Sequence, residues 1–85
     1  MPQAKRPPSA ERVLFGQRLR TERHARQLTL EDVAEAADMN WSYIAQVERG
    51  VRNISIDNMA ALAGALGVAL SVLLEDTPPE GRSAS

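Results

Sequence analysis

Three polar side chains between residues 41 and 49 have the types and the spacing to recognise another molecule by hydrogen bonding. On a helix, Ser42, Gln46 and Arg49 project on one arc, together with Trp41 and Ala45. The Ser42 hydroxyl can donate or accept, and the Gln46 carboxamide can pair with both N6 and N7 of adenine. The arc therefore predicts a surface that reads the edges of DNA bases.

Two aromatic residues adjoin this arc and allow two interpretations. Trp41 offers little to a polar edge, but it could cover a thymine methyl group or lie along the sugar–phosphate wall. Tyr43, at the edge of the arc, is placed to reach a phosphate. Alternatively, both rings pack against the preceding helix near Leu30.

The loop after this helix carries donors that suit phosphate groups. Arg52 supplies a charged guanidinium group and Asn53 a neutral amide. Backbone N–H groups at the start of the preceding helix, at Leu30, add a further site for a phosphate. We therefore expect the DNA backbone to lie along this loop and this helix end.

Residues 30–49 read as two short amphipathic helices joined by a tight turn, which is the arrangement of a helix-turn-helix. Ala34 lies where the second helix crosses the first, and a large side chain there would hold the helices apart. The inward-facing residues are Val33, Ala37, Met39, Ile44 and Val47. A helix-turn-helix presents its second helix to the DNA major groove, so the polar arc would face the DNA.

The chain as a whole predicts an all-α fold, a compact bundle of five helices in which the second and third form the helix-turn-helix. No segment alternates with period two, so we expect no sheet. The first helix runs from Ser9 or Ala10 to Arg26. Its inward stripe holds Phe15, Leu19 and Arg23. Capping residues open the next three helices at Thr29, Asn40 and Ser55, and glycines close two of them at Gly50 and Gly67.

A short fifth helix is expected, in which Leu70, Leu73 and Leu74 are core residues and Val72 points outward. A domain of this size reads few base pairs, whereas two copies place their recognition helices about 34 Å apart on successive turns of the groove. We therefore expect a homodimer whose interface centres on Val72, with Leu70 and Leu73. The loop of residues 53–57 is the alternative surface.

Proline-rich segments mark the ends of the folded part. Residues 1–10 read as a flexible basic tail, and residues 77–85 as a second flexible tail, because Pro78 and Pro79 stop a helix. The domain is expected to span residues 11–76.

Charge is distributed unevenly along a chain of 85 residues whose net charge is −1. Residues 1–26 hold seven basic and two acidic side chains, whereas the remainder holds three basic and nine acidic ones. This asymmetry permits one basic face on a nearly neutral protein.

Several function classes are disfavoured by composition. Without cysteine there is no disulfide and no thiolate metal site, and His24 is the one histidine. We expect no enzyme activity, metal, cofactor or small-molecule ligand. The longest apolar run contains two glycines and is shorter than the ~20 residues that span a bilayer, so we expect a cytoplasmic protein associated with the nucleoid rather than with a membrane.

Arg23 and Glu48 are predicted to form an ion pair. Arg23 continues the apolar stripe of the first helix, and Glu48 falls at the margin of the inward arc of the third. A charge that faces a core is costly unless it is paired. The pair would fix the recognition helix relative to the first helix; the alternative is two independent surface charges.

The order and spacing of several segments resemble the lambda-repressor/Cro-like (XRE-type) helix-turn-helix family. The segments that carry the resemblance are FGQRLRTER, LTLEDVAEAA, YIAQVERG, RNISI and LAGALGV, which together span most of Phe15 to Leu74. The segment from Val47 to Ser55, after Tyr43 and Ile44, is similar to controller proteins of restriction–modification systems. This chain departs from the family pattern at Gln27 and Asp38, two positions where the family commonly has glycine.

The resemblance implies a transcriptional regulator that binds a palindromic or pseudopalindromic site on double-stranded DNA as a homodimer. It assigns base-edge roles to the positions of Trp41, Ser42 and Gln46. It assigns phosphate contacts to those of Tyr43, Arg52 and Asn53, and it supports the Arg23–Glu48 pair. The alternative function is a protein-interaction or antitoxin-like helical module that does not read DNA.

Overall fold

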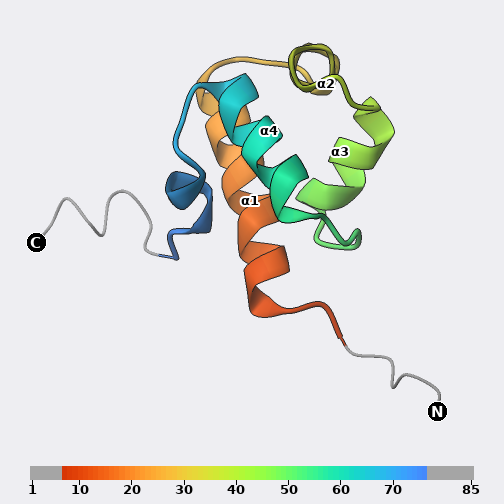
Figure 1. Ribbon diagram of the computed structural model, residues 1–85, viewed down its shortest axis with the longest axis vertical. Coiled ribbons are helices and arrows are strands. Elements are labelled where there is room, and N and C mark those ends of the chain that lie inside the picture. The colour runs from red at the N-terminus through yellow and green to blue at the C-terminus, as the bar shows by residue number, and fades with distance from the viewer. Residues whose placement is uncertain (1–6, 77–85) are drawn as a thin grey trace, which may run out of the picture.

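A computed structural model describes residues 7–76 of the protein. Over this range the chain forms four α-helices, α1 (Ala10–Ala25), α2 (Leu30–Ala37), α3 (Trp41–Glu48) and α4 (Ile56–Leu66), followed by a 3₁₀ helix, η1 (Leu70–Leu74). Figure 1 shows α1 as the central helix, with α3 on one side of it and η1 on the other. The all-helical expectation is confirmed over the described range, where no strand occurs.

The expectation of five α-helices is wrong, because residues 70–74 form a 3₁₀ helix. This element has five residues and begins without a side-chain cap. The 3₁₀ geometry is common in such short pieces. It also changes which leucines face inward: Leu73 is fully buried and Leu70 partly buried, whereas Leu74 is 38% exposed rather than part of the core.

The two tails predicted from the sequence fall mostly outside the described residues. The N-terminal tail was expected to reach residue 10. In the structure Ser9 caps α1 and Ala10 is its first residue, so these two residues belong to the folded part. The Ser9 hydroxyl accepts a hydrogen bond from the backbone N–H of Arg12, at 3.0 Å. The folded part therefore begins at Ser9 or earlier.

The predicted N-caps are confirmed at Thr29, Asn40 and Ser55. At Thr29 the contact is reciprocal: its hydroxyl accepts from the backbone N–H of Asp32, and its own backbone N–H donates to the Asp32 carboxylate. These hydrogen bonds lower the pKa of Asp32. The contact therefore stabilises α2 at neutral pH and is lost only as the pH falls through that lowered pKa.

Each of the four α-helices is followed, one or two residues after its end, by a residue with left-handed backbone. The four are Gln27, Asp38, Gly50 and Gly67, with φ between 57° and 76°. Glycine adopts this conformation without cost, whereas other residues are strained there. Gln27 and Asp38 are the two positions at which the resembled family has glycine, so the departures fall on strained backbone.

Gln27→Gly is expected to stabilise the protein by about 1 kcal/mol, because it removes the cost of a side chain at positive φ. Asp38→Gly should gain less, since a short polar side chain tolerates this conformation better. Urea denaturation measures both. The control is Gln17→Gly on the exposed face of α1, where the same replacement should cost about 0.5–1 kcal/mol. A loss of stability at Gln27 would contradict the prediction.

The core lies where α1, α3, α4 and η1 meet, with α2 closing one end. Val33, Ala34, Ile44 and Val47 are buried as expected, whereas Ala37 and Met39 are only partly buried at its margin. The other buried apolar residues are Phe15, Leu19, Leu62, Ala63, Leu66 and Leu73. No helix between residues 7 and 76 has both the length and the apolar content to cross a membrane.

The backbone of α1 approaches that of α3 closely at Gly16, a contact that the sequence analysis did not predict. A Cβ atom built there would overlap the Val47 carbonyl oxygen and lie 2.7 Å from the carbonyl oxygen of Glu48. Only glycine allows this contact, so Gly16 sets how closely α3 docks on the central helix.

Candidate nucleic-acid interface

The outer surface of α3 carries the arc that the sequence predicts. Ile44 and Val47 are buried beneath it, while Trp41, Ser42 and Arg49 are exposed. Ala45 and Gln46 are partly exposed. The tight turn at residues 38–40 and the N-cap Asn40 fix where α3 begins, and therefore which residues occupy its first turn.

The N-cap residue Asn40 binds both the backbone and the side chain of Ser42. The Asn40 side-chain oxygen accepts from the backbone N–H of Ser42 at 2.8 Å and from the Ser42 hydroxyl at 2.6 Å. The hydroxyl proton is therefore engaged, which leaves the lone pairs of the exposed Ser42 oxygen available as acceptors.

Arg52 lies against the arc, joined to two of its residues. Its guanidinium group donates to the Gln46 side-chain oxygen at 2.9 Å and sits 5.3 Å from the centre of the Tyr43 ring. The Tyr43 hydroxyl accepts in turn from the Asn58 amide of α4, at 3.3 Å. This contact between Arg52 and Gln46 was not foreseen, because the backbone must turn at Gly50 before residue 52 can return to α3.

The two aromatic residues differ in their surroundings. Trp41 is 50% exposed, which leaves half of its surface open to a binding partner. Tyr43 is partly buried and packs against the core, as does Leu30 at the start of α2. The ring of Tyr43 supports Arg52, and both lie beside the recognition arc.

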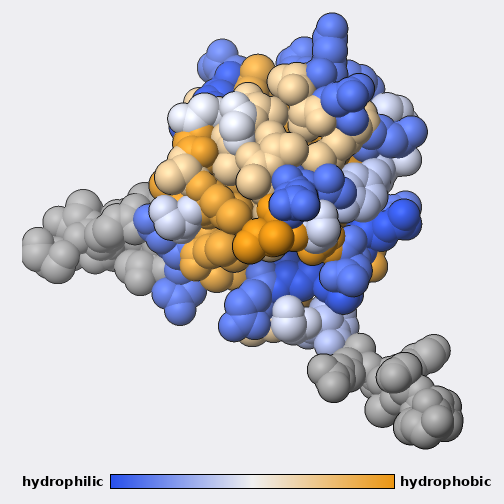
Figure 2. Space-filling view, viewed as in Figure 1, coloured by the Kyte–Doolittle hydropathy of each residue, from blue (hydrophilic) through white to orange (hydrophobic). Residues whose placement is uncertain are grey.

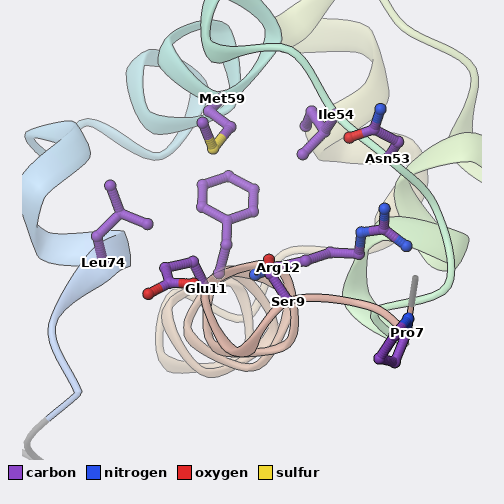
Figure 3. A pocket seen from close by; sticks show the side chains of 9 residues that line it. Pro7, Ser9, Glu11, Arg12, Asn53, Ile54, Met59 and Leu74 are labelled. Atoms are coloured by element: carbon purple, nitrogen blue, oxygen red, sulfur yellow. Dashed lines mark hydrogen bonds between the residues drawn. The ribbon is translucent and has the colours of Figure 1, made fainter. Parts of the chain in front are cut away.

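Asn53 lines a groove between the start of α1 and the segment that leads into α4. The groove has a volume of about 450 Å³. Figure 3 shows Ile54, Met59 and Leu74 approaching it from different elements, with Asn53 beside Ile54. Pro7, Ser9, Glu11, Arg12 and Phe15 complete the lining.

The predicted pair of Arg23 and Glu48 is formed, with two parallel hydrogen bonds. Arg23 Nε donates to Glu48 Oε2 at 2.7 Å and Nη2 to Oε1 at 2.9 Å. Both side chains are at most 10% exposed, and the third guanidinium nitrogen, Nη1, donates to the carbonyl of Leu28 at 2.9 Å. The hydrogen bond with Glu48 raises the pKa of Arg23. The pair therefore locks the end of α3 to α1 and to the turn before α2.

The predicted dimer residues are only partly at the surface. Leu73 is fully buried within the chain and cannot contact a second copy, and Val72 is half-buried rather than pointing outward. The backbone of Val72 is held to α1, because its carbonyl accepts from Arg18 at 3.4 Å. The 3₁₀ geometry explains the partial burial of Val72 but not the burial of Leu73, which faces inward on either kind of helix. The exposed apolar residues nearby are Leu74 and Ile56, the latter 65% exposed.

The chemistry of α3 and its loop is that of recognition by hydrogen bonding. Within residues 7–76, no three His, Asp or Glu side chains gather as a metal site requires. The surface combines the polar residues of α3, the guanidinium group of Arg52 on the Tyr43 ring, and helix N-termini. These features suit a nucleic acid, whose phosphates are anionic and whose base edges form hydrogen bonds.

Comparisons with known proteins agree with this geometry. A profile of the helix-turn-helix domain family matches residues 14–75. The control protein C.BamHI of Bacillus amyloliquefaciens is 40% identical over 67 residues, which cover 78% of this chain and 83% of that protein. The restriction–modification controller protein C.AhdI from Aeromonas hydrophila has a TM-score of 0.73 at 43% identity, covering 76% of this chain and 98% of that one. The controller C.Esp1396I, solved as a tetramer in complex with its natural 35-base-pair operator, has a TM-score of 0.72 at 25% identity, covering 76% and 86%.

Proposed function

The chain belongs to the XRE-type helix-turn-helix family, and from this premise we propose that it is a sequence-specific DNA-binding transcriptional regulator. The observation that carries the proposal is the outer face of α3, where a row of polar side chains lies beside Arg52. The C.Esp1396I–operator complex supports it, because a protein of the same fold binds duplex DNA. A partner-binding module would instead present a mostly apolar arc on α3, whereas Trp41 and Ala45 are the apolar residues of this arc and its other members are polar.

In this proposal α3 enters the major groove, and residues near its start reach the base edges. Trp41, Ser42 and Gln46 read bases. Tyr43, Arg52, Asn53 and the backbone N–H groups at Leu30 contact phosphates. Arg52 donates to the side-chain oxygen of Gln46, so the two residues lie close enough for one to contact a phosphate while the other reaches a base.

Gln46→Ala and Arg52→Ala are expected to separate reading from positioning. Loss of the Gln46 amide should weaken binding by about 1–3 kcal/mol and relax preference at one position of each half-site. Loss of Arg52 should weaken binding to all sequences alike and lower the dependence of log K on log salt by about one. The measurement is selection from a random duplex library, then titration of the selected site at several salt concentrations.

The control for these variants is Gln17→Ala, which removes the same amide from the exposed face of α1 and should leave binding unchanged. A variant at Gln46 that kept both affinity and base preference would exclude it as a reading residue. If Arg52→Ala changed base preference with the salt slope unaltered, Arg52 would act through Gln46 and not on a phosphate.

We propose that the dimer surface is the apolar face around the groove that Ile54, Met59 and Leu74 line against α1. Figure 2 shows apolar residues gathered over α4 and towards η1. An exposed apolar patch rimmed by polar groups is typical of an interaction site. The selection experiment tests the dimer as well, because two symmetric copies on DNA return a site with inverted half-sites.

The similarity to C.BamHI and C.AhdI supports a narrower role, control of a restriction–modification system. A regulator acts where the DNA is, so the proposal also places the protein in the cytoplasm, at the nucleoid. No enzymatic step is part of it.

A further inference from the structure

Trp41 belongs to the outward arc of α3 but takes no part in the hydrogen bonds that join Ser42 to Asn40 and Gln46 to Arg52. It is the first residue of α3, and half of its surface is exposed. Within residues 7–76 the indole N–H of Trp41 has no hydrogen-bond partner, and no cation stacks on its ring as Arg52 does on the ring of Tyr43. A tryptophan held open in this way exposes a large apolar surface to water, which is unfavourable until something covers it.

The neighbours of Trp41 divide the face of α3 into two rows. Residues four apart on a helix lie one above the other. Ser42 and Gln46 form a polar row whose side chains are already engaged, Ser42 with Asn40 and Gln46 with Arg52. Trp41 and Ala45 form a parallel row that has no polar side-chain atom except the indole N–H. The apolar row therefore needs an apolar partner.

The major groove offers one apolar group, the C5-methyl group of thymine, which 5-methylcytosine also carries. We propose that Trp41, with Ala45 beside it, is the specificity-determining residue that recognises the C5-methyl group of a pyrimidine in each half-site. This inference rests on the proposed function, because it needs α3 to lie in the major groove. It goes further in naming the chemical group that is read.

The test uses duplexes that differ by single methyl groups. In the site selected from the random library, each thymine is replaced in turn by deoxyuridine, which removes the methyl group and leaves the pairing and the O4 acceptor intact. At one thymine per half-site the wild-type protein should lose about four-fold in affinity, the effect of one buried methyl group. Replacement in both half-sites should cost about fifteen-fold.

The converse duplex places a C·G pair at the same position. Methylation of that cytosine at C5 should recover about four-fold in affinity relative to the unmethylated pair. The gain would identify the methyl group, and not the identity of the base, as the feature that is read.

Variants of the exposed indole complete the experiment without disturbing the core. Trp41→Ala should bind the thymine and deoxyuridine duplexes alike, and Trp41→Phe, which keeps an apolar ring, should retain most of the discrimination. Gln46→Ala is the matched control from the polar row and should keep the full methyl effect.

Three results would overturn the inference while leaving DNA binding in place. The first is a selected site without a thymine in either half. The second is a wild-type affinity for every deoxyuridine duplex that equals the affinity for the unmodified site. The third is the same loss of affinity on removal of the methyl group in the wild type and in Trp41→Ala. If no duplex is enriched at all, the proposed function itself fails.

Discussion

Arg23→Met is expected to destabilise the protein by about 3–5 kcal/mol, which is a large part of the stability of a domain this small. The replacement leaves the Glu48 carboxylate, whose side chain is 6% exposed, without its cation. It also leaves the carbonyl of Leu28 without the donor Nη1. A buried charge without a partner is far more costly than the pair that it came from. Urea denaturation followed by circular dichroism measures the loss.

A double-mutant cycle separates the pair from its two residues. Arg23→Met with Glu48→Leu together should cost much less than the sum of the single changes, because neither charge is then stranded. Arg23→Lys is the graded control, since it keeps the charge but cannot form two parallel hydrogen bonds. Simple additivity in the cycle would show that the two side chains do not depend on each other.

The Arg23–Glu48 pair was predictable from the sequence because both charges fall on stripes that otherwise hold apolar residues. The N-caps were predictable because Thr29, Asn40 and Ser55 each precede a helical pattern, and their side chains bind backbone N–H groups within three residues. Such local features depend on few neighbours, so the sequence alone determines them.

The errors arose where the geometry of an element departs from the α-helix or where two elements meet. At ~100° per residue Leu70, Leu73 and Leu74 share a face, but in a 3₁₀ helix residues three apart eclipse each other and the next one turns away. Leu74 is therefore exposed, whereas Leu73 stays on the inward face and is fully buried, so it serves the core and not a dimer interface. The contact of Arg52 with Gln46 likewise depends on the path of the chain after Gly50.

Gly16→Ala is expected to destabilise the protein by about 3 kcal/mol, at the upper end of the usual cost of overpacking. Alanine favours an isolated helix over glycine by about 1 kcal/mol, so the sign of the effect depends on the contact with α3. The added Cβ meets the carbonyl oxygens of Val47 and Glu48, which are backbone atoms and cannot rotate aside. Relief requires α3 to move away from α1, which also strains the Arg23–Glu48 pair.

Gly64 provides the matched control, because it is a helical glycine in α4 whose added Cβ would have no atom within 4 Å. Gly64→Ala should stabilise by about 1 kcal/mol, so the same replacement is expected to have opposite signs at the two sites. Denaturation midpoints compare them directly. DNA affinity adds a second readout, since a displaced α3 carries Trp41 and Gln46 with it. If both alanine variants were stabilised, the close approach of α1 and α3 at Gly16 would be wrong, and the orientation of the recognition helix would have to be set elsewhere.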